Sequence, residues 1–218
     1  MERKNVMYNC ANCGLQGCTR GVLEESLPDC PNKNEEVQAK AKALYQEEEN
    51  KKIAYNAALV EAQGYGIKTR IEETMDFAQK CGYKKIGLIF CKGLSKEAKI
   101  VHNIFTYHDF TVISVICKNG GTAKSFLDIS EEDTISGKCD EVMCNPIGQA
   151  LLMNEQQTDF NVIMGLCVGH DTLVMKYLEA PMTTLAVKDR VTGHNPLAPI
   201  YLSESYYKKL YPKAKFKK

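Results

Sequence analysis

The sequence lacks any long apolar run. No stretch approaches the roughly 20 consecutive apolar residues that a membrane-spanning helix needs. The opening residues, MERKNVMYNC, contain no apolar block of the kind found in secretory signals. Neither a membrane-spanning nor a secreted protein is therefore expected. We expect the chain to work in the cytoplasm, where thiols stay reduced.

The sequence also lacks an excess of either charge. Its 28 Lys and Arg residues balance 27 Asp and Glu residues, which leaves a formal net charge of +1. A balance of this kind favours neither nucleic acid nor a membrane surface as a partner. Internal repeats and low-complexity linkers are missing as well. The 218 residues suit one domain with an appendage, or two small domains.

Cysteine, in contrast, is abundant, with ten residues in the chain. In a reducing compartment, disulfides are not the expected use of so many thiols. Metal binding or thiol chemistry is the better expectation.

Four cysteines stand close together near the start of the chain. Cys10 and Cys13 form a C-x-x-C pair, a tight turn that can bring two sulfurs onto one ion, and Cys18 and Cys30 follow. Zinc takes four thiolates in a tetrahedron. A 4Fe–4S cluster also takes four cysteines, and Cys-Pro endings are familiar from bacterial ferredoxins. The spacing is neither that of a ferredoxin nor that of a zinc ribbon, and redox thiols stay open as an alternative.

The chain divides by composition into three segments. Residues 1–34 form the Cys-rich segment, whose weak periodicity indicates that it would not form a core of its own without a staple. Residues 35–66 are rich in Ala, Glu, Lys and Leu and predict a connector of one long helix, or of two joined near Glu48. Residues 67–218 form the third segment, in which apolar runs of strand length alternate with helical patterns.

The third segment predicts an α/β fold. Its apolar runs cover 84–90, 111–116, 160–166 and 182–187. Strands that alternate with helices are typical of βαβ units, and nearly continuous apolar strands favour a parallel sheet that is covered on both faces. We therefore predict an open, doubly wound, Rossmann-like parallel sheet.

Cysteines recur where these strands end. Cys91, Cys117 and Cys167 each follow a strand run, and parallel strands would bring all three to one edge of the sheet. Cys144 precedes a predicted helix that starts at Asn145, whose N-terminal N–H groups and dipole would lower its pKa. We predict that the four thiols converge on one ligand or metal. The alternative is that three of them are small apolar residues buried at strand ends.

Three residues are candidates for catalysis. Cys144 would be the nucleophile of a thiol enzyme. His170, in GLCVGHD, could act as a metal ligand, an acid–base group or a helix cap. Lys188, in KDR after the fourth strand, could hold an anionic substrate or balance the charge of a cluster; a salt-bridged loop is the alternative.

Several blocks of the sequence resemble a known family. They are CANCGLQGC with its later CP, GYKKIGLIFCKGLSKEA, MCNPIGQA, GLCVGHD and VKDRVTGHNP. Together they cover nearly the whole chain and resemble the predicted metal-binding proteins catalogued as domain of unknown function eighteen-forty-seven, found mainly in anaerobic bacteria and archaea. The resemblance implies a cytoplasmic protein of anaerobes, in which oxygen-sensitive clusters survive. It favours iron–sulfur over zinc and implies no particular reaction.

The leading hypothesis is thus an iron–sulfur protein with two centres. Cys10, Cys13, Cys18 and Cys30 would hold a 4Fe–4S cluster, and Cys91, Cys117, Cys144 and Cys167 would hold or line a second centre. That centre could act on a small or anionic molecule as a Lewis acid or electron donor, and electron transfer would imply a partner protein. The alternative is a zinc-stapled module that binds a ligand or a metal without catalysis. Whether the protein is an enzyme stays open.

Overall fold

The structure is a computed structural model that describes residues 7–211. The chain forms two compact units, Met1–Leu59 and Val60–Lys218. The three-segment division expected from the sequence stays a prediction.

The first unit consists of short turns followed by helix. Four 3-10 turns precede α1 (Glu35–Leu44), and they cover Cys10–Asn12, Gly17–Arg20, Leu23–Glu25 and Pro31–Lys33. Asn34 caps α1, because its side-chain oxygen accepts the N–H of Val37 at 3.2 Å. Helix α1 buries no side chain, and Gly17 is the one buried residue in the four turns. A unit with so little apolar core depends on some other source of stability.

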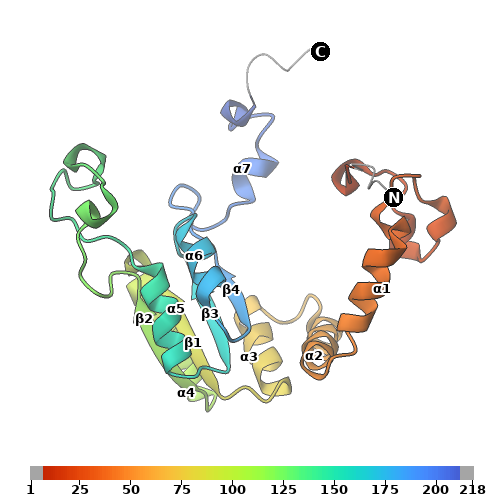
Figure 1. Ribbon diagram of the computed structural model, residues 1–218, viewed down its shortest axis with the longest axis horizontal. Helices are drawn as coiled ribbons and strands as arrows, with labels where there is room; N and C mark the ends of the chain where they lie inside the picture. Colours follow the sequence, from red (N-terminus) through yellow and green to blue (C-terminus); the bar gives the residue numbers. More distant parts are fainter. Residues whose placement is uncertain (1–6, 212–218) are drawn as a thin grey trace. The chain divides into compact units, whose positions relative to one another are not determined.

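A break separates α1 from α2 (Glu48–Gly64) (Figure 1). The Asn50 side chain donates to the Leu44 carbonyl at 3.1 Å and so satisfies one of the free carbonyls at the end of α1. Of the two arrangements that the sequence allowed, two helices are the one that forms. Helix α2 runs across the boundary at Leu59, beyond which the second unit begins.

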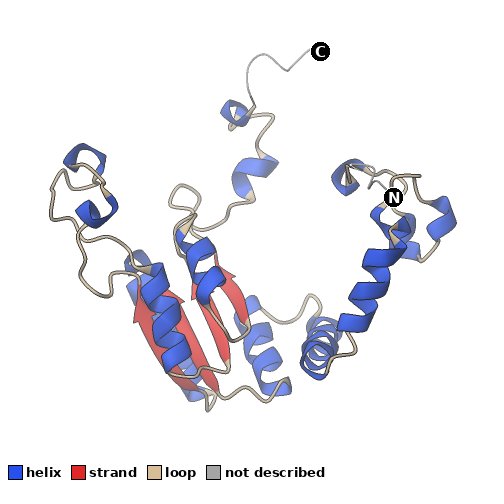
Figure 2. Cartoon of the chain, viewed as in Figure 1, coloured by secondary structure: helices blue, strands red, loops and turns tan. Residues whose placement is uncertain are grey.

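The second unit is built on a four-stranded parallel sheet. Its strands are β1 (Lys85–Phe90), β2 (Thr111–Ile116), β3 (Phe160–Met164) and β4 (Met182–Ala186), in the order β2-β1-β3-β4. All three strand pairs are parallel. Helices lie on both faces of the sheet (Figure 2). The predicted open, Rossmann-like α/β fold is therefore confirmed.

Two apolar layers cover the two faces. Helices α3 (Arg70–Lys80) and α4 (Ser95–Tyr107) pack on one face, where Met75, Ala98 and Phe105 meet strand residues such as Leu88 and Val162. Helices α5 (Pro146–Glu155) and α6 (His170–Tyr177) pack on the other face. The core of that second layer includes Ile89, Met153, Ile163, Leu166 and Val174. Burial of alternate strand residues on opposite faces is what fixes the register of each strand.

The strand order creates a switch point between β1 and β3. The chain leaves β1 through α4 to reach β2 on one side, and it leaves β3 through α6 to reach β4 on the other side. In open α/β sheets, ligands bind at the carboxyl ends of strands where the connections diverge in this way. The carboxyl ends of β1 and β3 are therefore where a site is expected.

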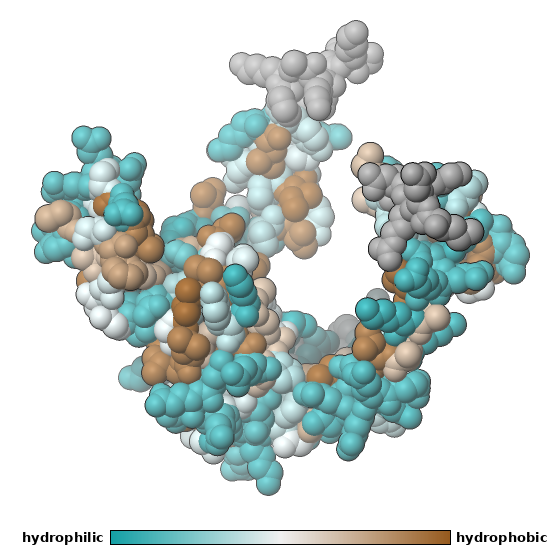
Figure 3. All heavy atoms as spheres, in the orientation of Figure 1, coloured by the Kyte–Doolittle hydropathy of each residue, from teal (hydrophilic) through white to brown (hydrophobic). Residues whose placement is uncertain are grey.

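Residues 118–143 form an irregular excursion between β2 and α5. Its two arms meet at an isolated antiparallel bridge, Ala123 to Val142, and at an ion pair of 2.6 Å between Lys124 and Glu141. Phe126 is well exposed, and brown apolar spheres appear among teal ones on this segment at the left of Figure 3.

Among the described residues, no helix has the length and apolar character needed to cross a membrane.

Gly87, in the middle of β1, leaves room for two side chains. A Cβ at this position would lie 2.1 Å from Oδ1 of Asn161 and 2.8 Å from Sδ of Met153. Gly87→Ala should therefore lower the free energy of unfolding by roughly 1–3 kcal/mol, the usual cost of overpacking a core. Urea denaturation followed by circular dichroism measures the change.

Gly64→Ala is the matched control for this substitution. Its added Cβ would meet only the flexible side chain of Lys68, at 3.2 Å from Cδ. Alanine also favours helix over glycine, so we expect this variant to be as stable as the wild type or more stable. Equal stabilities for the two variants would contradict the packing described for β1.

Candidate metal and thiol site at the carboxyl edge of the sheet

The structure brings the four predicted thiols of the α/β unit to one edge. Cys91 follows β1 directly, Cys117 follows β2 directly, and Cys167 lies three residues beyond β3. Cys144 lies two residues before α5. The thiols of Cys91, Cys117 and Cys144 form a hydrogen-bonded chain, and Cys167 is within electrostatic reach of Cys144. The parallel strands therefore place these thiols at one edge of the sheet, and their convergence on a common ligand or metal stays a prediction.

A pair of asparagines joins the loops that carry Cys117 and Cys144. The Asn145 N–H donates to the Cys117 carbonyl at 2.7 Å. The Asn119 amide donates to the Asn145 carbonyl, and the Asn145 amide donates to Oδ1 of Asn119, both at 3.1 Å. Asn145 also caps α5 by accepting the N–H of Gly148 at 2.9 Å. These bonds hold the loop after β2 against the start of α5.

Gln149 connects α5 to the carboxyl ends of β1 and β2. Its side chain is fully buried, and its amide nitrogen donates to the carbonyls of Val115 at 2.7 Å and Phe90 at 3.2 Å. These two acceptors lie just before Cys117 and Cys91 in the strands. Sequence reasoning missed Gln149 and Asn119. The available signal for Gln149 was a polar residue inside the otherwise apolar stretch IGQALLM.

Gly165 allows the loops after β1 and β3 to approach each other. It has a φ of +60°, and a Cβ there would lie 2.1 Å from Cδ1 of Leu94. A side chain at this position would therefore push the β1 loop away from the end of β3. Because Leu94 lies three residues after Cys91, this close approach is part of what brings Cys91 and Cys167 to one site.

The thiols differ in acidity because the hydrogen bonds between them have a direction. Hydrogen bonding to Cys117, together with burial, raises the pKa of Cys91 to about 12. Hydrogen bonding to Cys144 raises the pKa of Cys117 in turn. Cys144 is the final acceptor, and its pKa falls to about 7 because of Cys117 and, more weakly, the nearby charge of Lys118. The low pKa predicted for Cys144 is present, and the hydrogen bond from Cys117 is its largest cause.

N–H groups are directed at the other sulfurs. The Arg190 guanidinium donates to Sγ of Cys167 at 3.0 Å, and this bond raises the pKa of Arg190. Lys188 hydrogen-bonds to Cys91 and opposes the rise in the pKa of that thiol. The N–H of Lys92 donates to Sγ of Cys117 at 3.3 Å. The sequence predicted that the two cations of the KDR block, Lys188 and Arg190, would hold an anionic substrate or balance cluster charge, and both lie beside these sulfurs.

Asp189 fixes the loop that carries these two cations. Its carboxylate accepts the N–H groups of Val191 at 2.9 Å and Thr192 at 3.0 Å, and the Thr192 bonds lower its pKa. Its own N–H donates to Nδ1 of His194 at 3.1 Å. His194 therefore stabilises this loop through Asp189.

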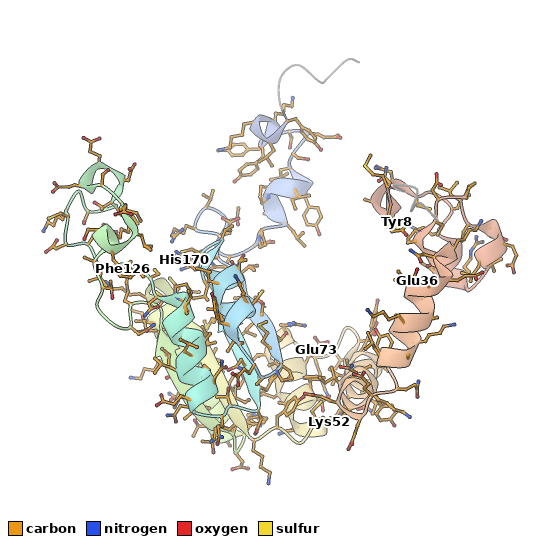
Figure 4. The ribbon with its side chains drawn as sticks, viewed as in Figure 1. Tyr8, Glu36, Lys52, Glu73, Phe126 and His170 are labelled. Carbon is orange, nitrogen blue, oxygen red and sulfur yellow. The ribbon has the colours of Figure 1, made fainter. Side chains whose placement is uncertain are left out.

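His170 opens α6 beside the thiols, where Figure 4 labels it. Its N–H donates to the Cys167 carbonyl at 3.0 Å, which closes the turn between β3 and α6. Burial lowers the pKa of its imidazole, while the charge of Cys91 acts in the opposite direction. The side chain is thus placed within electrostatic reach of the site, as a candidate acid–base residue would be.

In the first unit, three of the four predicted cysteines line one cavity of about 260 Å³: Cys10, Cys13 and Cys30. The N–H groups of Gln16 and Leu15 donate to the Cys13 sulfur and lower the pKa of that thiol. Cys18 is exposed and does not line this cavity. The remaining two cysteines of the chain are Cys81, which packs in the core under α3 and α4, and Cys139, which is exposed.

Across residues 7–211, no three Cys, His, Asp or Glu side chains are gathered tightly enough to hold a metal ion as they stand. Binding would therefore draw the sulfurs inward, and such coupling between metal binding and local folding is usual. The donor set does fit a soft metal centre, because it consists of sulfur atoms that accept N–H bonds from cationic and backbone groups.

Comparison with known proteins identifies the family. The family model described as "Protein of unknown function (DUF1847)" matches residues 30–185. The chain belongs to this family. It is also 45% identical to Uncharacterized protein MJ0455 of Methanocaldococcus jannaschii over 201 residues, which cover 92% of this chain and 97% of that protein. No solved structure matches the chain. The DUF1847 match begins at Cys30 and includes all four thiols at the sheet edge.

The pKa values lead to a test of the site in the reduced, metal-free protein. We expect the rate of Cys144 alkylation to rise through a midpoint near pH 7, below the ordinary thiol value of 9.0, because only the thiolate reacts. Cys91 should stay unreactive until the pH approaches about 12. Quantitative peptide mass spectrometry after iodoacetamide pulses at several pH values measures both rates, and a shared midpoint would contradict the hydrogen-bonded chain.

Proposed function

We propose that this DUF1847 protein is an iron–sulfur protein and that Cys91, Cys117, Cys144 and Cys167 hold a cluster at the carboxyl edge of the sheet. The observation that carries the proposal is the convergence of four thiols from four separate segments on the switch point. Cysteines that serve only as small apolar residues at strand ends have no need of such a common location.

The charges around the sulfurs support a metal–thiolate centre. Four thiolates with their metal carry net negative charge, which needs compensation where water is partly excluded. Arg190 donates to Cys167, Lys188 to Cys91, and Lys118 lies in electrostatic reach of Cys144. N–H bonds to cluster sulfurs are also one of the features by which proteins set a reduction potential.

A second centre in the first unit belongs to the same proposal. Cys10, Cys13 and Cys30 line one cavity, and the unit around them has little apolar core. A metal there would supply stability that the turns lack, as in other small metal-dependent folds. When bound, the two centres would supply one-electron transfer to a small molecule or to a partner protein.

The chain's own residues suggest how a ligand would be received. His170 lies beside the thiols with a lowered pKa, so near neutral pH it is available to accept a proton. Lys188 and Arg190 provide positive charge on the same edge, which suits a small anionic molecule. His170 would thus act as an acid–base group, and Lys188 and Arg190 would bind the anionic part of the ligand.

Metal analysis of the full-length chain tests the proposal. After anaerobic reconstitution with iron and sulfide, wild-type protein should be brown and contain two centres. Cys117→Ala should lose about one centre's iron and sulfide, because Cys117 links the other thiols at the sheet edge. Iron and acid-labile sulfide per chain are measured together with the visible absorbance.

Cys139→Ala is the control, since Cys139 is exposed and lies on the excursion between β2 and α5. It should retain the wild-type iron and sulfide. Colourless wild-type protein that holds only zinc would contradict the iron–sulfur proposal and support the zinc-stapled module. Equal metal content in Cys117→Ala and wild type would exclude a centre at the sheet edge.

Arg190 should influence the reduction potential of the centre. Its cationic N–H bond to Cys167 favours the more negative, reduced state, so Arg190→Gln should lower the midpoint potential, by on the order of tens of millivolts. Lys176→Gln, on α6, is the matched control. It also removes a cation, but the Lys176 ammonium lies over the Tyr177 ring, 5.5 Å from the ring centroid. Potentiometric titration followed in the visible region measures both, and identical shifts would show that Arg190 has no specific role.

A further inference from the structure

The cavity in the first unit is lined by a donor set that differs from the four-cysteine set expected from the sequence. Cys10, Cys13 and Cys30 line the cavity, and Asp29, which directly precedes Cys30, lines it with them. The turn Cys10–Asn12 is closed by the Cys13 N–H, which donates to the Cys10 carbonyl at 3.1 Å and keeps the first two thiols together. The Cys30 N–H donates to the Leu27 carbonyl at 3.0 Å and fixes the segment that carries Asp29 and Cys30.

Cys18 is held in a separate, closed loop. The N–H of Val22 donates to the Gly17 carbonyl at 3.0 Å, and the N–H of Gly21 donates to the Cys18 carbonyl at 3.3 Å. An ion pair between Arg20 and Glu25 ties the far side of the same loop. Movement of Cys18 into the cavity would require these contacts to open, whereas the other three thiols already line it.

The geometry points to a three-thiolate centre in the first unit, with Cys10, Cys13 and Cys30 as ligands and the Asp29 carboxylate in the fourth position. Cys18 is then not a ligand. The inference rests on the proposed function, because it assumes that a metal centre forms there. Carboxylate oxygen is an accepted ligand of both iron and zinc, but it is a harder donor than thiolate. The Asp29 position is therefore the one at which a small anionic ligand would exchange.

Differential alkylation of the full-length, metal-loaded protein tests the ligand set residue by residue. Iodoacetamide is applied to anaerobically reconstituted and to metal-free protein, and each cysteine is quantified by peptide mass spectrometry. Metal should slow the labelling of Cys10, Cys13 and Cys30 by roughly tenfold or more, since a ligated thiolate is no longer a free nucleophile. Cys18 should be labelled as fast as the exposed Cys139 in both states.

The outcomes separate this inference from the function on which it rests. Protection of Cys18 together with Cys10, Cys13 and Cys30 would overturn the three-thiolate assignment and leave the metal centre in place. Equal labelling of all four with and without metal would overturn both the assignment and the proposed centre in this unit.

Asp29→Asn tests the fourth ligand. Loss of a residue that only supports a metal ligand typically costs about 10–100-fold in affinity, so loss of a direct ligand should make this variant release iron to a chelator roughly tenfold faster than wild type, or faster still. Glu24→Gln, an exposed neighbour in the turn Leu23–Glu25, should release iron at the wild-type rate. Release from Asp29→Asn at the wild-type rate would remove Asp29 from the ligand set.

Discussion

The parallel direction of all four strands is the constraint on which the site depends. It sends every loop after a strand to the same edge, and the order β2-β1-β3-β4 makes the connections diverge between β1 and β3. Cys91, Cys117 and Cys167 reach that edge from three different strands. Cys144 arrives from the start of α5 and completes the group. No short sequence motif could gather these four thiols, because they lie far apart along the chain.

Polar side chains then hold the thiols in place. Gln149 ties α5 to the ends of β1 and β2, and the Asn119–Asn145 pair joins the loops of Cys117 and Cys144. The amide nitrogen of the fully buried Gln149 makes two hydrogen bonds, which offset part of the cost of burying this polar group at the ends of β1 and β2. Arg190 and Lys188 add positive charge from the loop after β4. Hydrogen bonds and positive charges at this edge are thus both directed toward the segments that carry the four thiols.

Much of the fold could be predicted from the sequence, because strand-length apolar runs alternate with helical patterns and parallel strands share an edge. The position of Cys144 just before a helix could be predicted from the sequence as well. Its low pKa, however, depends on Cys117 and Lys118, which only the folded chain brings near. The roles of Gln149 and Asn119 could not be foreseen for the same reason. Spacing alone grouped Cys18 with Cys10, Cys13 and Cys30, whereas in the structure the other three line the cavity and Cys18 does not.

We propose that the sheet edge binds a metal through four thiols. Anomalous X-ray diffraction at the iron and zinc absorption edges, from crystals of the full-length protein grown without oxygen, tests it most directly. We expect strong iron anomalous density enclosed by the sulfurs of Cys91, Cys117, Cys144 and Cys167. Well-ordered sulfurs at this edge with no anomalous density between them, in crystals of fully reconstituted protein, would contradict it.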